Sequence, residues 1–277
     1  MSILHAVILG IVQGLSEFLP ISSSGHLIVV PWLFGWDDFA SSVAAERAFD
    51  TALHLGTLIA LLFYLRDELR LYIHDGLRAV FVPSLRRSVH GRLAWFFVVS
   101  SLPAAIVGGI GDAWITEHLG KPWLIASSLI IFGVILVWAD RQSGQRDVES
   151  FTVRDAVTLG VAQVLALNPG TSRSGITITA ARRQGFSRDA AARVSFLMGV
   201  PVIAGAVAYK LLKLISDGVP DGLLVPIAVG IVASGISGWF AMWGMIRLLR
   251  TRSFAPFVVY RVVAGIVIFG LLASNVR

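Results

Sequence analysis

The chain of 277 residues is 56% hydrophobic and only 14% charged, and its mean hydropathy is +0.77. Soluble domains contain roughly 45–50% apolar and about 25% charged residues, so this composition leaves too little polar surface for a soluble globule and indicates a membrane protein. The net charge of +6 would favour nucleic-acid binding in a soluble protein. In a membrane protein, basic residues collect in cytoplasmic loops, so we expect no nucleic-acid partner. The absence of cysteine excludes disulfides and thiolate sites.

Six apolar stretches are candidates to cross the membrane, which takes about 20 mostly apolar residues. They cover residues 51–65 (extending upstream through 48), 93–110, 122–139, 194–214, 223–246 and 257–274. Two further stretches, 3–33 and 156–181, are broken near the middle by Pro, Gly and Ser. Such breaks are tolerated at membrane depth only where the backbone is buried in protein or lines a wet cavity. We therefore predict two re-entrant helical hairpins.

The distribution of arginine predicts how the chain is threaded. Arginine-rich segments, expected on the cytoplasmic side, are 66–92, 141–154, 182–193 and 247–252. Segments charged mainly by Asp and Glu, expected outside, are 112–121 and 215–222. With this threading the first hairpin enters the membrane from outside and the second from the cytoplasm.

The two hairpins also share a sequence pattern. Leu9–Gln13 matches Leu159–Gln163 at an offset of 150, and the serines and glycine at 22, 24 and 25 recur at 172, 174 and 175. Broken helices that meet near the midplane of an inverted repeat are typical of transporters. We predict an all-α polytopic membrane protein with an inverted-topology repeat, two re-entrant hairpins and about six full transmembrane helices. It forms a single integral membrane domain, with repeat one about 1–140 and repeat two about 150–277.

The first candidate site lies at the break of the first hairpin. Gln13 and Glu17 are four residues apart and share a helix face, and Pro20 ends that helix. The serines of Ser22–Gly25 can cap the next helix, whose start suits a phosphate. Glu17 would hold a divalent cation or act as a base, and His26 would move a proton. A serine cap and a satisfied polar histidine are the alternatives, but a Glu in an apolar span is costly and most often functional.

The second candidate site, Asn168–Gly175, carries Arg173 at the break of the other hairpin. An arginine there can bind anionic oxygens bidentately, and the alternative is a snorkelling or salt-bridging side chain. If the hairpins meet, Glu17, the serines, His26 and Arg173 converge into an anion site suited to phosphoryl transfer. Asp50 and Arg261, near span ends, are equally well interpreted as interface anchors or as site residues.

From the residues alone, three classes of protein remain open: an enzyme acting on an anionic substrate, a carrier or flippase for a phosphorylated lipid, and a non-catalytic scaffold. A carrier needs the anion site but no nucleophile beside a base. A scaffold leaves the cost of Glu17, His26 and Arg173 in apolar surroundings unexplained.

Both motifs closely resemble those of the undecaprenyl-diphosphatase family of integral membrane phosphatases. The resemblance rests on Gln13–His26, Pro169–Gly175 and the ending Phe257–Arg261, with matching length and hydropathy. It implies hydrolysis of the phosphoanhydride of undecaprenyl diphosphate to undecaprenyl phosphate and inorganic phosphate. This reaction recycles the lipid carrier for peptidoglycan synthesis and cell-wall biogenesis, and it confers bacitracin resistance.

The resemblance also implies roles for individual residues. Glu17 is tied to catalysis and to a divalent cation, Mg²⁺ or Ca²⁺, and Arg173 is tied to diphosphate binding. Ser23 and His26 are expected to serve as nucleophile and base; Ser23 is preferred to Ser24 by resemblance only, and His26 could instead activate a water. Substrate contacts are expected from Gln13, Ser22, Ser24, Thr171, Ser172 and Ser174. Many family members have a second glutamate at the position of Gln13, so this chain lacks one carboxylate of a two-carboxylate metal site.

The expected partners are a polyprenyl diphosphate and membrane lipids, and a homodimer is compatible with the sequence. The resemblance implies a multi-pass protein of the bacterial plasma (inner) membrane whose site opens to the periplasmic side.

Overall fold

The computed structural model describes residues 1–39, 42–217 and 222–274, which contain helices, one isolated bridge between Arg146 and Phe186, and no β-strand. The α-helices are α1 (Ile3–Phe18), α2 (Ser23–Phe34), α3 (Val43–Tyr64), α4 (Arg66–Phe81), α5 (Val89–Leu119), α6 (Pro122–Asp140), α7 (Val153–Val164), α8 (Arg173–Arg183), α9 (Arg188–Asp217), α10 (Leu224–Leu249) and α11 (Ala255–Ala273). Short 3₁₀ helices are η1 (Pro83–Arg87), η2 (Val148–Ser150) and η3 (Leu165–Leu167).

Five of the six predicted membrane spans are confirmed, and the sixth, residues 51–65, passes only as part of a bent pair of helices. Within the described residues, α5, α6, α9, α10 and α11 are each long and apolar enough to cross a membrane, and α3 with α4 forms a sixth candidate bent by 84°. One boundary was wrong: residues 112–119, expected in an outside loop, continue α5 to Leu119. Glycines at 109 and 111 do not stop this helix, and the next proline, Pro122, already begins α6.

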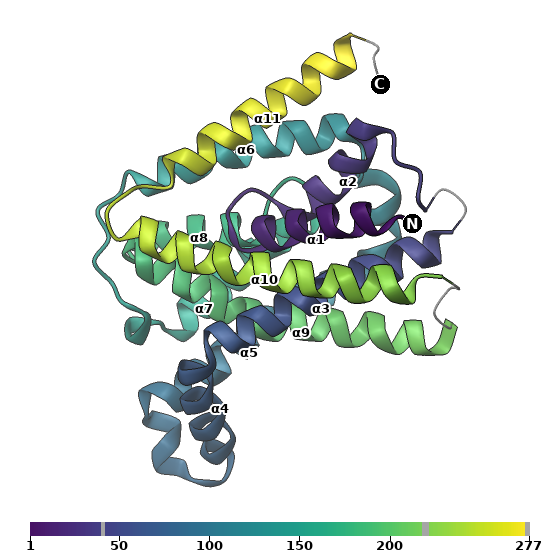
Figure 1. Cartoon of the computed structure of the whole chain (residues 1–277). Helices are drawn as coiled ribbons and strands as arrows, with labels where there is room; N and C mark the ends of the chain where they lie inside the picture. Colours follow the sequence, from purple (N-terminus) through teal and green to yellow (C-terminus); the bar gives the residue numbers. More distant parts are fainter. Residues whose placement is uncertain (40–41, 218–221, 275–277) are drawn as a thin grey trace.

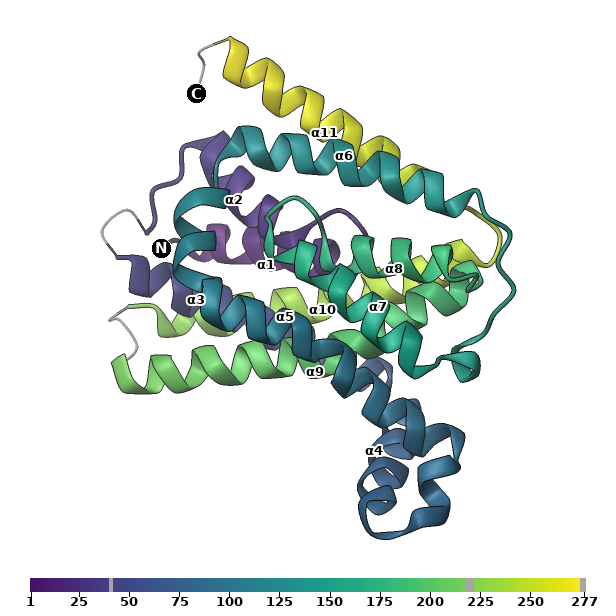
Figure 2. The ribbon, with the colours of Figure 1, turned by 180° about the vertical axis from the view of Figure 1, so that it is seen from behind.

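Both broken stretches fold as the predicted hairpins. The first breaks between α1 and α2, and the second between α7 and α8, with η3 in the break. The four short helices lie in the middle of the bundle, between the pair α6–α11 and the layer of α3, α9 and α10 (Figures 1 and 2). The boundaries of the two repeats stay a prediction.

Small residues let the helices that carry the hairpins pack closely. α1 packs along α10, where a Cβ added to Gly10 would lie 2.7 Å from the Cβ of Ala233, and one on Gly14 would collide with Ser234 and Ser237. α7 packs against α5 in the same manner, with Gly160 against the main chain of Ser100. In a membrane the hydrophobic effect does not drive helices together, because lipid is as apolar as the helix surface. Helices therefore associate through close van der Waals packing, which small residues permit.

The arginine-rich segments gather at one end of the bundle, as the threading predicts. Arg188 donates to the carboxylate of Asp140 at 2.7 Å, and Arg182 forms an ion pair with the same group at 3.3 Å. The main-chain N–H of Phe254, just after the last arginine-rich segment, also donates to Asp140. Arg193 connects α4 to this end through Glu68, at 2.5 Å.

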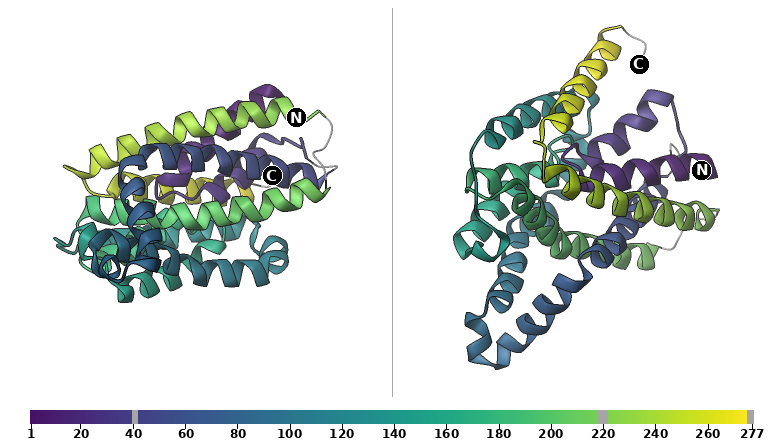
Figure 3. Two further views of the ribbon diagram at one scale, coloured as in Figure 1. Left: turned by 90° about the horizontal axis from the view of Figure 1, so that it is seen from below. Right: turned by 60° about the vertical axis from the view of Figure 1, so that its left-hand side comes forward.

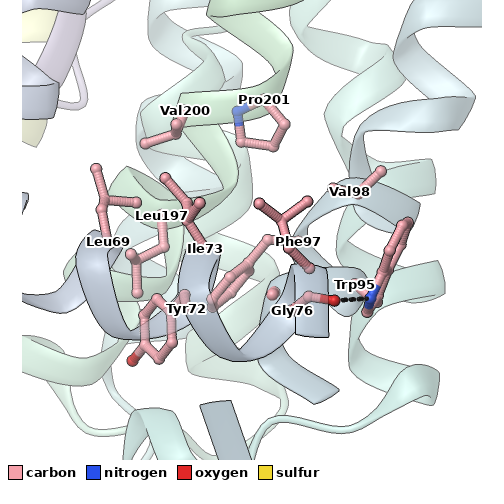
Figure 4. A pocket seen from close by; sticks show the side chains of 12 residues that line it. Leu69, Tyr72, Ile73, Gly76, Trp95, Phe97, Val98, Leu197, Val200 and Pro201 are labelled. Carbon is pink, nitrogen blue, oxygen red and sulfur yellow. Dashed lines mark hydrogen bonds between the residues drawn. The ribbon is translucent and has the colours of Figure 1, made fainter. Parts of the chain in front are cut away.

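α4 and the turn after it project sideways from the bundle (Figures 1 and 3). Between α4, α5 and α9 lies an apolar groove of about 220 Å³, lined among others by Tyr72, Phe97 and Val200, with Trp95 donating to the carbonyl of Gly76 (Figure 4). A second apolar groove of about 470 Å³ lies between α3 and α10. Both grooves offer apolar surface suited to lipid chains.

Candidate active site at the crossing of the two hairpins

The second halves of the two hairpins begin in the same way. Ser22 caps α2 by accepting from the N–H of Gly25, and Ser172 caps α8 by accepting from the N–H of Gly175. Both caps have positive φ, 78° and 75°, and they are the only residues other than glycine with positive φ in the described chain. Because this conformation costs about 1–3 kcal/mol in each residue, the surrounding structure must hold both caps in place.

The tips of the hairpins touch each other, so the two motifs meet. The N–H of Gly170 donates to the hydroxyl of Ser22 at 3.0 Å, and the hydroxyl of Ser174 donates to the carbonyl of Leu19 at 3.0 Å. Each hairpin thereby provides a hydrogen-bond partner for a polar group of the other. This contact brings the start of α2 and the start of α8, both positive dipole ends, to one place.

Glu17, in the last turn of α1, is the centre of the site and is 6% exposed. Its Oε2 accepts hydrogen bonds from the hydroxyl of Ser23 at 2.6 Å and from the amide of Gln13 at 3.2 Å. Its Oε1 accepts from the guanidinium of Arg173 at 3.4 Å. The carboxylate therefore joins the candidate nucleophile of one hairpin to the candidate anion-binding group of the other.

Arg173 is the first residue of α8, and its side chain is 13% exposed. One nitrogen donates to the carbonyl of Ser195 on α9 at 3.0 Å, and the buried Nε has no partner. Gly199 leaves room for this side chain, since a Cβ there would lie 2.7 Å from the guanidinium. A guanidinium with an unused donor beside two helix starts is suited to bind anionic oxygens.

His26 is hydrogen-bonded away from the candidate nucleophile. Its Nδ1 donates to the carbonyl of Ser22 at 2.6 Å, so Nε2 carries the lone pair in the neutral ring and accepts from the hydroxyl of Tyr260 at 2.7 Å. The hydrogen bonds in the described chain thus pair Ser23 with Glu17 and His26 with Tyr260. They do not support the expectation that His26 is the base for Ser23, because both ring nitrogens are already engaged.

Four of the predicted substrate contacts are buried in the crossing itself. The hydroxyl of Thr171 accepts from the amide of Asn168, and that of Ser172 is bonded to the hydroxyl of Ser174. The hydroxyls of Ser22 and Ser174 make the hydrogen bonds between the two tips. All four are at most 4% exposed. Ser24 is exposed and Ser23 is partly exposed, so these two hydroxyls are the more accessible ones. A role of any of these side chains in substrate binding stays a prediction.

Two residues that the sequence did not assign to the site, His54 and Tyr260, lie at it, and so does Arg261, for which the sequence left both interpretations open. His54 of α3 places Nε2 3.9 Å from Glu17, while its Nδ1 donates to the carbonyl of Asp50. Tyr260 contacts His26, and Arg261, treated above as a possible interface anchor, is fully buried at the hairpin tips. A histidine inside an apolar span was the one local signal that could have indicated His54.

The oxygen atoms around Glu17 suit a hard cation held together with a substrate. No group of three or more Asp, Glu or His side chains is clustered for a metal within the described ranges. Mg²⁺, however, commonly uses one or two carboxylates and completes its shell with waters and substrate phosphates. Oε1 of Gln13 is buried and has no hydrogen-bond partner. This orphan oxygen, next to the carboxylate of Glu17, fits a Mg²⁺ or Ca²⁺ ligand.

The fold and the site define a polytopic membrane protein with an acid–serine–arginine centre where two re-entrant hairpins cross. The sequence matches the family described as Bacitracin resistance protein BacA over residues 6–267. It is 43% identical to the undecaprenyl-diphosphatase of Pelobacter propionicus, over 100% of this chain and 99% of that protein. It is 45% identical to the undecaprenyl-diphosphatase of Geobacter sulfurreducens, over 96% of each. The chain belongs to the bacitracin resistance protein BacA family.

Proposed function

We propose that the chain hydrolyses undecaprenyl diphosphate to undecaprenyl phosphate and inorganic phosphate, which recycles the lipid carrier for peptidoglycan synthesis and confers resistance to bacitracin. The observation that carries this assignment is the 2.6 Å hydrogen bond from Ser23 to Glu17 beside Arg173. A carrier would need the arginine but would not need a serine hydroxyl held against a buried carboxylate. The substrate named for the relatives supplies the chemical identity of the anion.

The charges around the crossing favour a diphosphate. Arg173 and the buried Arg261 lie at the tips together with the positive ends of α2 and α8, whereas Glu17 is the carboxylate that both Ser23 and Arg173 contact. Anionic oxygens bound here would replace the single carboxylate as the partner of Arg173 and reach the first N–H groups of the two helices.

The geometry supports Glu17 as the group that accepts the proton of Ser23. As the serine oxygen bonds to the terminal phosphorus, its proton passes to Oε2 of Glu17 and the bond to the bridging oxygen breaks. Undecaprenyl phosphate then leaves with the bridging oxygen. Water then attacks the phosphorus of the phosphoserine, the bond to the Ser23 oxygen breaks, and Glu17 returns its proton to that oxygen. The protons of the attacking water leave with the inorganic phosphate.

A divalent cation fits beside Glu17 and Gln13, where its ligands would be the carboxylate and Oε1 of the amide. When bound, it neutralises charge on the diphosphate and so favours nucleophilic attack. Gln13 is neutral, so of these two ligands only Glu17 would bring a negative charge to the cation.

We further infer a place and orientation in the cell. The threading of the arginine-rich segments supports a multi-pass protein of the bacterial plasma membrane with those segments in the cytoplasm. The first hairpin, which carries Glu17, Ser23 and His26, then enters from the periplasmic side, which favours a site that opens there. The polyprenyl chain would lie along apolar helix surfaces facing the bilayer, and a homodimer stays compatible with this arrangement.

Phosphate release from farnesyl or undecaprenyl diphosphate by the purified protein in detergent tests the proposal. We expect release that EDTA suppresses and Mg²⁺ or Ca²⁺ restores, and that Arg173→Ala abolishes. A folded protein that binds the diphosphate through Arg173 without releasing phosphate would contradict the phosphatase and indicate a carrier of phosphorylated lipids.

A further inference from the structure

Arg261 of α11 is a fully buried arginine that joins three segments far apart in the sequence. Its guanidinium donates to the carbonyl of Pro20 at the first tip, at 3.0 Å. It donates to the carbonyls of Gly170 and Thr171 at the second tip, at 2.9 and 3.1 Å. On α6 it donates to the carbonyls of Ser128 and Leu129, at 3.2 and 3.0 Å.

All five acceptors are main-chain carbonyl oxygens, so the cation is buried in a cage of dipoles rather than against a carboxylate. A buried charge without a counter-ion costs several kcal/mol and is a poor way to stabilise a fold. A role beyond packing is therefore required to account for this residue.

Three of the carbonyls that Arg261 binds lie one or two residues before the two strained caps. Thr171 is followed by the cap Ser172 and then by Arg173, while Pro20 lies two residues before the cap Ser22 and three before Ser23. Peptide groups are planar, so a carbonyl that is held in place also orients the N–H of the next residue and limits the conformations with which the chain can enter each cap. One guanidinium thereby sets the starts of α2 and α8 relative to each other.

We propose that Arg261 is a positioning residue that holds the two hairpin tips in register, so that Ser23 and Arg173 meet at Glu17. The inference rests on the proposed phosphatase function and adds a residue from the last helix to that site. Arg261 acts through the tips and does not need to touch the substrate. Because the positioned groups act on charge that develops in the transition state, losing the register lowers kcat more than it raises KM.

Arg261→Lys is the main test, since lysine keeps the charge but cannot span carbonyls from three segments. The matched control is Arg182→Lys on α8, because Arg182 is 3% exposed and also binds carbonyls, those of Asp140 and Phe186. Both variants lose a buried guanidinium. We expect kcat to fall about 10- to 100-fold in Arg261→Lys, with KM within about threefold, as a misplacement near 1 Å would produce. For the folded fraction of the Arg182→Lys control, we expect kcat and KM to stay within about twofold of the wild-type values.

A second variant disturbs the guanidinium without removing it. A Cβ on Gly175 would lie 2.9 Å from the guanidinium of Arg261 and 3.0 Å from the Cβ of the cap Ser172, whereas a Cβ on Gly133 would lie at an ordinary 3.5 Å from Arg261. We expect Gly175→Ala to lower kcat at least about fivefold relative to Gly133→Ala. A monodisperse Arg261→Lys protein with kcat within twofold of the wild type would overturn the proposal. If that variant does not fold, equal kcat in the two alanine variants overturns it. Wild-type protein without phosphate release would instead refute the proposed function.

Discussion

The hydroxyl of Ser23 lies 2.6 Å from Oε2 of Glu17, although the two residues belong to different helices on either side of the hairpin break. The same carboxylate contacts Arg173 from the other hairpin. The candidate nucleophile, proton acceptor and anion-binding group are thus connected by two hydrogen bonds, and the one from Arg173 depends on the two hairpins crossing where they do.

Replacing Ser23 separates the covalent reaction from direct attack by water. Ser23→Ala should lower kcat for phosphate release by about 10²–10⁴-fold, because the hydroxyl aligned with Glu17 is lost. Ser127→Ala on α6 is the control and should retain activity within a few-fold, because that hydroxyl bonds only to the carbonyl of Trp123 on its own helix. Phosphate release under saturating substrate measures both variants. Turnover of Ser23→Ala at the wild-type rate would exclude a serine nucleophile at this position and leave attack by water.

Because Glu17 and Arg173 form an ion pair, we expect replacing Arg173 alone to destabilise the fold more than replacing both residues. Arg173→Ala leaves the carboxylate of Glu17 buried without its cation and should lower the free energy of unfolding by about 3–5 kcal/mol. The double variant Glu17→Gln, Arg173→Ala should recover part of this loss. Thermal unfolding in detergent measures the difference. A double variant that is less stable than Arg173→Ala would contradict a charge penalty as the cause.

The hydrogen bond between His26 and Tyr260 predicts coupling between α2 and α11. Tyr260→Phe removes the donor to Nε2 and should slow phosphate release less than His26→Ala does. The double variant should resemble His26→Ala, with a coupling free energy of about 0.5–3 kcal/mol in the activation barrier. Additive effects on kcat would mean that the two side chains act independently.

Asp155, just before the apolar stretch of the second hairpin, predicts how stability depends on pH. Burial raises the pKa of Asp155, but hydrogen bonds from Arg146 and Thr152 outweigh burial and hold that pKa below its ordinary value of 3.8. The group therefore stabilises the fold above pH 3.8, and this contribution disappears as the pH falls from there through the folded pKa.

We expect Asp155→Asn to lower the free energy of unfolding at pH 7 by about 1–3 kcal/mol, because Arg146 loses its partner. The difference in the free energy of unfolding between this variant and the wild type should stay constant from pH 7 to 5 and become smaller below about pH 4. Glu117→Gln, at a carboxylate that is 78% exposed, is the control and should change little. A gap that widens in acid would show that the aspartate is not stabilised as its charged form.

The membrane spans, the positions of the hairpin breaks and two of the site residues could be predicted from local sequence. Run lengths of apolar residues determined the spans, and Pro20 and Pro169 with their serines and glycines determined where the hairpins break, because a membrane excludes unsatisfied backbone. Glu17 and Arg173 stood out for a related reason, since a charge in an apolar stretch is costly unless it serves a purpose. A cap within Ser22–Gly25 was predicted from sequence, and the structure shows that the matching serine of the second hairpin, Ser172, is a cap as well.

Tertiary structure alone decided which of these groups face one another. Ser23 points to Glu17, His26 turns to Tyr260 across 234 residues of chain, and Arg261 reaches both tips instead of the membrane interface. These pairings depend on the approach of α11 and on how the hairpins cross. Helical periodicity fixes the face of a single helix, but it carries no information about which helix from the other half of the chain that face will meet.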